Sequence, residues 1–254
     1  MNRSAFLKTM AFGTLGLLAG GAARKLPAAQ AAEKDKGLVV SCFGDSTTWG
    51  ANGEKTGGGN AIAWPAKLGA FLDVQKVYNF GKKGSRIAVT VDRQDSFLER
   101  LDAVLAQPAD LILLLGGVND FQHDVPLGEY GSTDPATFYG AYETILQKLI
   151  AAQPQAHLIV MTPMKENFQH PTKHYPKSFD KNAQGVTQEA YVEAVRQEAA
   201  RYSLPVFDLF NESGISPFHP AQQKLYMPDG LHYNEAGYTR LAQRIAAGIE
   251  AVLD

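Results

Sequence analysis

Ser46 lies in the stretch "FGDSTTWG", directly after the apolar run "GLVVSC". A serine hydroxyl is a poor nucleophile unless an imidazole takes its proton and a carboxylate holds that imidazole in the right tautomer. His232 stands in "PDGLH", just before the last predicted helix, and Asp229 precedes it by three residues. At this spacing one loop can bring the carboxylate to Nδ1, so these three residue types predict a nucleophile, a base and an orienting acid for attack on a carbonyl carbon.

Acyl transfer also needs donors that point at the oxygen that becomes negative. Gly81, in "NFGKKGS", offers a backbone N–H that no side chain obstructs, and Asn119, in "GVND", offers a neutral amide N–H₂. Each of these short motifs alone is more often a turn or a helix cap. Their order and their positions at strand ends are what favour chemistry.

The elements that must position these residues alternate along the chain. Short apolar or β-branched runs, bounded by Gly, Pro, Asn or Asp, predict strands, and the longer amphipathic runs predict helices. The strands are expected at Leu38–Cys42, Val74–Asn79, Asp110–Leu115, His157–Met161 and Pro205–Asp208. The helices are expected at Pro65–Leu72, Ser96–Ala106, Pro135–Ala152, Thr187–Tyr202 and Asn234–Leu253. This alternation predicts an α/β fold, a parallel sheet covered by helices on both faces.

Long irregular segments follow the carboxyl ends of the predicted strands. They span residues 43–64, 116–134, 162–186 and 209–233. Ligands of open α/β sheets bind outside the carboxyl ends of the strands, and long loops in compact domains are usually functional. The four motifs fall on this same rim, which we therefore expect to be the site.

With these motifs in place, the sequence resembles the SGNH hydrolases, the GDSL-like esterase and lipase family. The matching blocks are "GDS", "NFGKKGS", "GVND" and "DGLH", and Thr47 stands where the family often has Leu or Ile. The resemblance implies a three-layer α/β/α fold with a five-stranded parallel, flavodoxin-like sheet over residues 32–254. It implies these roles: nucleophile Ser46, base His232, orienting acid Asp229, and oxyanion donors Ser46, Gly81 and Asn119.

The prediction that follows is an exported serine esterase that hydrolyses short acyl esters, O-acetyl foremost, on carbohydrates through an acyl-enzyme on Ser46. Thr47 and the polar, aromatic rim loops favour a short acyl group on a polar substrate. A lysophospholipase or acyl thioesterase of the same family is the alternative among hydrolases. An O-acyltransferase with the same triad, and a non-catalytic binding module, are the alternatives from other classes.

Several rim residues could contact a substrate, although local loop packing explains any one of them equally well. Those predicted as contacts are Trp49, Phe121, His123 and Phe168, with Tyr130 and Tyr175 nearby in the same loops. Asp45 and Asp120 are expected to bond loop backbone. His170 and His174 have a spacing that can bind metal on a helix, but Pro171 and Pro176 disfavour a helix there. Neither a metal nor a cofactor is expected.

Composition and the N-terminus indicate where the protein acts. The net charge of −2 over 254 residues gives no reason to expect nucleic acid as a partner. Residues 1–31 predict a signal peptide that ends at the A-x-A site of residues 29–31 and leaves no stable membrane insertion. "NRSAFLK" resembles a twin-arginine signal with Ser4 in place of the second arginine, so export to the periplasm or the medium is expected. The single cysteine, Cys42, is expected to be buried.

Overall fold

A parallel sheet forms the centre of the computed structural model, which describes residues 37–52 and 57–253. The predicted signal peptide lies outside the described residues. The strands follow the order β2-β1-β3-β4-β5, and all of the pairs are parallel. Their bounds are β1 Leu38–Gly44, β2 Val74–Gly81, β3 Leu111–Leu115, β4 His157–Met161 and β5 Val206–Phe207. The five-stranded parallel sheet is thus confirmed. The strand β5 is one residue shorter than predicted at each end.

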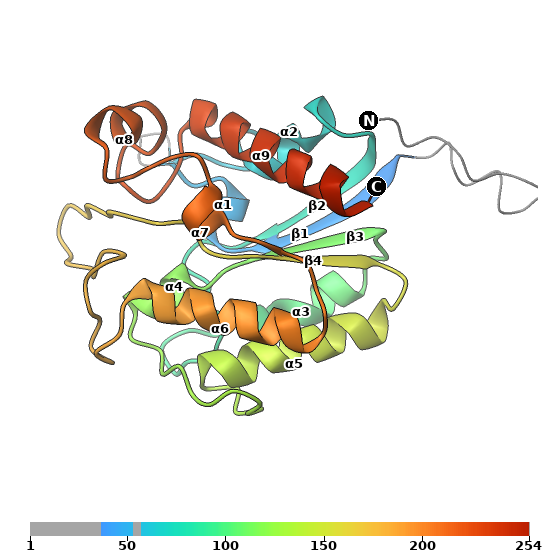
Figure 1. Ribbon diagram of the computed structural model, residues 1–254, viewed down its shortest axis with the longest axis horizontal. Helices are drawn as coiled ribbons and strands as arrows, with labels where there is room; N and C mark the ends of the chain where they lie inside the picture. The colour runs from blue at the N-terminus through green and yellow to red at the C-terminus, as the bar shows by residue number, and fades with distance from the viewer. Residues whose placement is uncertain (1–36, 53–56, 254) are drawn as a thin grey trace, which may run out of the picture. The chain divides into compact units, whose positions relative to one another are not determined.

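Helices cover both faces of the sheet, which confirms the three layers (Figure 1). One face carries α3 (Phe97–Leu105), α5 (Phe138–Ala152) and α6 (Gln188–Arg201). The other face carries α2 (Trp64–Lys67), which continues into the 3₁₀ turn η2 (Leu68–Ala70), and α9 (Glu235–Leu253). Short helices stand on the rim loops: α1 Ser46–Trp49, α4 Val118–Gln122, α7 Leu209–Glu212 and α8 Pro220–Tyr226.

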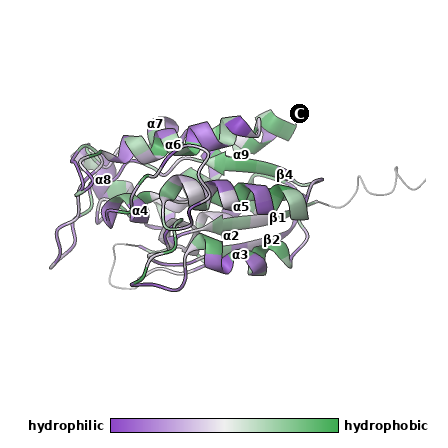
Figure 2. Ribbon diagram, turned by 90° about the horizontal axis from the view of Figure 1, so that it is seen from below, coloured by the Kyte–Doolittle hydropathy of each residue, from purple (hydrophilic) through white to green (hydrophobic). Residues whose placement is uncertain are grey.

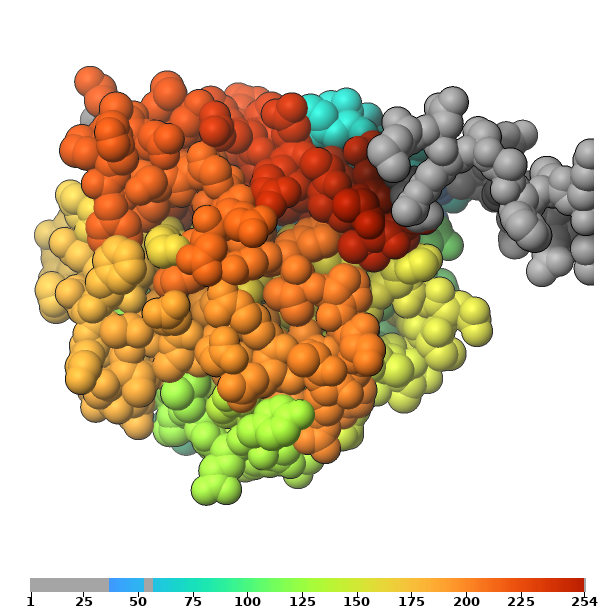
Figure 3. All heavy atoms as spheres, in the orientation of Figure 1, coloured from blue at the N-terminus to red at the C-terminus, as the bar shows by residue number. Residues whose placement is uncertain are grey.

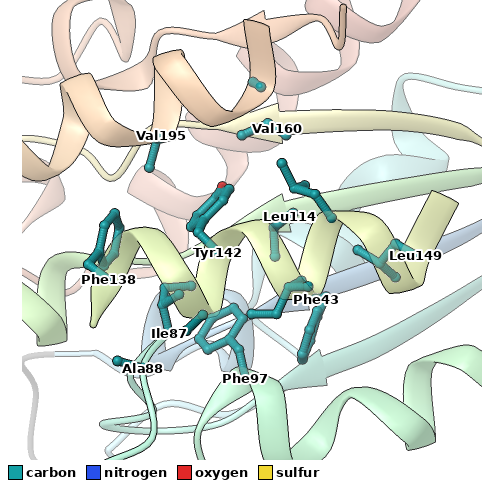
Figure 4. Close-up of a cluster of buried hydrophobic side chains, with 14 of the residues drawn as sticks. Phe43, Ile87, Ala88, Phe97, Leu114, Phe138, Tyr142, Leu149, Val160 and Val195 are labelled. Atoms are coloured by element: carbon teal, nitrogen blue, oxygen red, sulfur yellow. The ribbon is translucent and has the colours of Figure 1, made fainter. Parts of the chain in front are cut away.

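The strands are apolar on both faces because each face is buried. In β1, Phe43 packs into the core under α3 and α5, whereas Val40 and Cys42 pack into the core under α9, so Cys42 is buried as expected. Figure 4 shows Phe43 and Phe97 beside Leu114 in the first of these cores. In Figure 2 the strands β1 and β4 are mostly hydrophobic, in contrast to the largely hydrophilic loops near α8. Burial on both faces is typical of parallel strands that are covered by helices.

Helix starts follow the local capping chemistry. Ser96 and Glu99 form a capping box that starts α3, and Pro65 lies in the first turn of α2 as predicted. The helix predicted from Pro135 begins instead at Phe138, because the Thr137 side chain accepts the N–H of Gly140. No helix within residues 37–52 and 57–253 is both long and apolar enough to cross a membrane.

Candidate active site

Ser46, His232 and Asp229 meet at the carboxyl rim of the sheet. Nε2 of His232 lies 3.0 Å from Oγ of Ser46, and Nδ1 lies 2.8 Å from Oδ2 of Asp229. The serine and the histidine are 186 positions apart in sequence, so the fold alone brings them together. The geometry is that of a nucleophile bonded to a base whose other nitrogen is held by a carboxylate.

A tight turn at the end of β1 presents the serine. Asp45 caps α1 by accepting the N–H of Thr47 at 2.9 Å, which leaves Ser46 as the first residue of the helix. A side chain on Gly44 would overlap the side chain of Thr48, so the strand can turn this closely only with glycine there. Helix N–H groups in the first turn have no intrahelical acceptor, so the N–H of Ser46 is available to an oxyanion.

The acid and the base lie on one short turn between α8 and α9. Oδ1 of Asp229 accepts the backbone N–H groups of Leu231 at 2.9 Å and His232 at 2.7 Å. Burial opposes ionisation of Asp229, but the His232 imidazole and these N–H groups lower its pKa below the ordinary value. Asp229 is therefore an anion at neutral pH, as an orienting acid must be.

A second rim loop holds this turn from the outside. The N–H of Asn167 donates to the carbonyl of Gly230 at 2.8 Å, and the N–H of Gln169 donates to the carbonyl of Asp229 at 2.9 Å. Between them, the ring of Phe168 meets the His232 imidazole edge to face at 5.7 Å between ring centroids. On the face shown in Figure 3, the yellow to amber surface of the segment after β4 borders the orange-red surface of the segment around α8.

Asn119 lies on α4 with its amide at the same rim. It is buried, and its Nδ2 donates one hydrogen bond to the carbonyl of Ser85 at 3.0 Å. An amide nitrogen carries two N–H groups, so a second donor remains for an oxyanion. The neighbouring Asp120 holds the facing loop in place, because its carboxylate accepts the N–H groups of Ile87 and Ala88 at 2.9 and 3.1 Å.

Gly81 is predicted as an oxyanion donor, and its backbone packs closely against α1. Its N–H donates to Oδ1 of Asn79 at 2.8 Å and is therefore occupied in this conformation. A side chain on Gly81 would also overlap the backbone of Trp49, so the glycine lets β2 approach α1 closely. Its assignment as an oxyanion donor stays a prediction that requires this hydrogen bond to break.

Gly84, three residues further on, has a backbone N–H that the sequence analysis did not consider. Within the described part of the chain, its N–H makes no hydrogen bond. It directly precedes Ser85, whose carbonyl receives the Asn119 amide, so Gly84 belongs to the loop that faces Asn119. Its φ of +71° suits glycine. The signal that could have identified it is the second glycine of "NFGKKGS".

The predicted substrate contacts differ in exposure: His123 is exposed, and Phe168 is half-buried. Phe168 and His123 both border Tyr175, with ring centroids 5.5 Å away in each case, and form one ring cluster beside His232. Trp49 is half-buried at the end of α1 with the Lys83 ammonium 3.9 Å from its ring centroid. The prediction that Phe121 contacts the substrate is wrong, because its side chain is fully buried against Tyr191 in the core and does not face the rim.

The acids beside the catalytic residues have structural roles, as expected. Burial raises the pKa of Asp45 to about 6, although the Thr47 N–H and the nearby His232 imidazole act in the opposite direction. Burial also raises the pKa of Asp120 to about 7. Both carboxyl groups accept backbone N–H groups and thereby shape the turns on either side of the site.

The histidine pair of "HPTKHYP" does not form a metal site. Nδ1 of His170 accepts the N–H groups of Thr172 at 3.2 Å and Lys173 at 3.0 Å, as a turn acceptor does. Over residues 37–52 and 57–253, no group of three or more His, Cys, Asp or Glu side chains could hold a metal ion.

Comparison with known proteins decides the family. The model of the GDSL-like lipase/acylhydrolase family matches residues 42–240. The chain belongs to this family. The resemblance inferred from the four blocks is thereby confirmed, and the protein is a carboxylic ester hydrolase of the GDSL-like class.

Solved structures show the same fold. A protein from Lactobacillus plantarum shares 31% identity and a TM-score of 0.72, over 85% of this chain and 98% of that one. A lipase/acylhydrolase from Enterococcus faecalis has 21% identity and a TM-score of 0.57, over 84% and 96% of the two chains. A carbohydrate acetylesterase family member from Sinorhizobium meliloti has 20% identity and a TM-score of 0.58, over 85% and 98%. The last two likenesses show the fold. No curated protein matches the chain.

Proposed function

We propose that this GDSL-like hydrolase is an exported serine esterase that removes short acyl groups, acetyl foremost, from a polar substrate such as a glycan. The observation that carries the proposal is the continuous hydrogen-bonded line from Ser46 through His232 to Asp229, with separations of 3.0 and 2.8 Å. Such a line activates a serine hydroxyl for covalent catalysis.

The proposed mechanism uses this line twice. As Oγ of Ser46 attacks the ester carbonyl, its proton passes to Nε2 of His232, and the carbonyl oxygen becomes the oxyanion. The tetrahedral intermediate collapses when the alcohol leaves with the proton from Nε2, and an acyl-enzyme remains. Water then attacks in the same way, so that one water is consumed and one acid and one alcohol are released.

The oxyanion has three donors in this proposal. They are the N–H of Ser46 at the start of α1, the free N–H of the Asn119 amide, and a backbone N–H from the loop after β2. For the last of these we propose Gly84, because the N–H of Gly81 is already bonded to Asn79. These donors strengthen their bonds as the carbonyl oxygen becomes charged, which lowers the barrier.

A small cavity lies beside the catalytic residues, and any acyl group that entered it would have to displace lining side chains. It holds about 10 Å³, roughly the room of one water molecule. Its lining includes the neighbours of several site residues: Asp45 and Thr47 flank Ser46, Val118 precedes Asn119, and Leu231 precedes His232. The remaining lining is Leu115, Pro163, Met164 and Lys165.

A chain-length series tests the proposal. Mature protein is assayed on acetyl, butyryl, octanoyl and palmitoyl p-nitrophenyl esters, and acetate release is measured from acetylated glycans. We expect the highest kcat/KM with acetyl and a steep fall by octanoyl. Activity that rises toward palmitoyl would favour a lysophospholipase and contradict the acetylesterase. Strong transfer to an added sugar, with little hydrolysis in its absence, would favour an acyltransferase.

Export is tested separately. The proposal takes residues 1–31 as a cleaved signal peptide, which the A-x-A site and the short apolar stretch support. Full-length protein is expressed, and the N-terminal sequence of the exported product is determined. A chain that begins near Ala32 is expected, whereas an uncleaved chain in the membrane fraction would contradict this part of the proposal.

A further inference from the structure

Arg100 of α3 contacts the segments that carry two of the proposed oxyanion donors, Ser46 and Gly84, and it contacts Ser85, which binds the third donor, Asn119. Its Nη1 donates to the carbonyl of Phe80 at 2.9 Å, and its Nη2 donates to the carbonyl of Gly44 at 3.2 Å. Nη2 also donates to Oγ of Ser85 at 3.0 Å, and Nε donates to the carbonyl of Asp95 at 3.0 Å. One side chain thus spans the ends of β1 and β2 and the loop between β2 and α3.

Each of these segments leads directly to the site. Gly44 ends β1 two positions before Ser46, whose N–H is the first proposed donor. Phe80 lies at the end of β2, just before the loop with Gly84. Ser85 follows Gly84, and its carbonyl accepts the amide of Asn119, the third donor. The relative positions of all three donors therefore depend on segments that contact Arg100.

The packing around Arg100 keeps the guanidinium in one place. It lies 5.1 Å from the ring centroids of both Phe43 and Phe97, which border it from β1 and from its own helix. Its acceptors are three carbonyls and one hydroxyl. The planar fork of an arginine can bond several acceptors at fixed angles at once, which a lysine cannot do.

The charge of Arg100 persists at neutral pH. Burial lowers the pKa of the guanidinium to about 10, against the charges of Asp95 and Asp45, which raise it. A buried charge is costly unless it is hydrogen-bonded. The carbonyl oxygens of Gly44 and Phe80 are therefore held firmly toward the cation.

We infer that Arg100 is a positioning residue for acyl transfer, which sets the spacing of the oxyanion donors by joining the ends of β1 and β2 to the Ser85 loop. It acts through these segments and does not touch the substrate. Because the donors gain their strength only as the oxyanion forms, losing their alignment lowers kcat more than it raises KM.

The test compares Arg100→Met, Arg100→Lys and wild type on p-nitrophenyl acetate. The concentration of active sites is first measured by complete labelling of Ser46 with a fluorophosphonate, so that a misfolded fraction does not count. For R100M we expect kcat per labelled site to fall about 10- to 100-fold, with KM within about twofold of wild type. R100K keeps the charge but not the fork, and should lose most of the same activity.

Two further variants keep the inference testable if R100M fails to fold. Ser85→Ala removes one acceptor of Arg100 and should lower kcat about 3- to 10-fold at unchanged KM, a fraction of the loss from a misplaced donor. Arg196→Met is the matched control: Arg196 pairs with Asp208 at 2.8 Å, so its loss should lower Tm but leave kcat per site unchanged. Wild-type kcat per site in R100K or R100M, or in S85A if R100M does not fold, would overturn the inference.

The inference rests on the proposed function, and the two fail differently. If the wild-type protein is not labelled at Ser46, or if Ser46→Ala keeps activity, the proposed serine mechanism is wrong. If the wild type is labelled and active while the Arg100 variants match it per site, the mechanism stands and the positioning role is wrong.

Discussion

Asp229 at the carboxyl rim and Glu198 between helices α5 and α6 are both largely removed from water, but their pKa values are shifted in opposite directions. Asp229 accepts two backbone N–H groups and faces the His232 imidazole, and its pKa lies below the ordinary value. Glu198 lies against Glu143, and burial together with the neighbouring carboxyl raises its pKa above the ordinary 4.5. Burial alone therefore does not decide whether an acid in this protein is charged.

The two pKa values differ because hydrogen-bond donors surround Asp229 but not Glu198. Between α5 and α6 the donors converge on Oε1 of Glu143, which accepts from Tyr202 and Gln147 at 2.7 Å each and pairs with Arg201 at 3.4 Å. Glu143 is accordingly the anion of the pair, and Glu198 keeps a proton. At the rim, the donors converge on the residue that the proposed mechanism needs as an anion. The following variants test this contrast, from the largest expected effect to the smallest.

Removing the nucleophile should have the largest effect. Ser46→Ala is expected to lower kcat on p-nitrophenyl acetate about 10⁵- to 10⁶-fold, and His232→Ala about as much, because the two residues act as one unit. The double variant should be no worse than either single one. If the losses in kcat of the two single variants multiplied in the double variant, the two residues would act independently. This would contradict a catalytic role for the rim as one hydrogen-bonded unit.

Changing the ionised rim acid should come next. Asp229→Asn is expected to lower kcat up to about 10⁴-fold, because an amide at this position can donate to Nδ1 and select the wrong tautomer of His232. The measurement is the pH profile of kcat, with fluorophosphonate labelling to count sites. A loss smaller than about tenfold would mean that the lowered pKa of Asp229 serves folding and not catalysis.

Loss of a neutral donor should have a smaller effect. Asn119→Ala is expected to lower kcat about 100- to 1,000-fold with little change in KM, because its amide stabilises only the developing oxyanion. The variant also frees the carbonyl of Ser85, so Tm is measured in parallel. A rise in KM at unchanged kcat would instead assign Asn119 to substrate binding.

The smallest effect is expected between α5 and α6, on stability alone. An unfolded chain ionises Glu198 above about pH 4.5, whereas the folded chain keeps the proton until the raised pKa is passed. This contribution to stability is therefore full below about pH 4.5. It is lost as the pH rises from there through the raised pKa of the folded protein. Glu198→Gln mimics the protonated acid and should raise the free energy of unfolding by about 1 kcal/mol at pH 8, with no gain at pH 4.

The control for this last variant lies on the same helix. Glu193 is exposed and pairs with Arg196 at 3.3 Å, so Glu193→Gln should change stability little at either pH. Chemical denaturation at the two pH values measures both variants. Neither should alter kcat per labelled site. Lower stability of E198Q at pH 8 would show that the folded protein stabilises the ionised form of Glu198, and the contrast with Asp229 would disappear.

Much of the site could be predicted from the sequence because its signals are local. The three-residue spacing of Asp229 and His232 places both on one turn, and the strand that ends at Gly44 presents Ser46 wherever the sheet lies. The alternation of apolar runs was enough to predict a parallel sheet between two helical layers. These features depend on short stretches whose chemistry admits few conformations.

The features that could not be predicted depend on contacts between distant segments. Two glycines lie three positions apart in "NFGKKGS", and nothing in that stretch shows that Asn79 occupies the N–H of the first. Phe121 follows Asn119 closely, but the direction in which α4 turns sends its ring into the core. Arg100 is one more arginine in an amphipathic helix until the ends of two strands are seen to converge on it.

Two members of the triad, Asp229 and His232, lie on one turn, and the third lies on another segment of the chain. Oδ1 of Asp229 accepts the backbone N–H of His232 while Oδ2 bonds to its ring, so two hydrogen bonds join the acid to the base. The nucleophile lies on a different segment, formed by β1 and α1. The 3.0 Å contact between Nε2 and Oγ joins this segment to the turn with Asp229 and His232. Separating these two segments would therefore break the contact between Nε2 and Oγ and leave both hydrogen bonds between Asp229 and His232 in place.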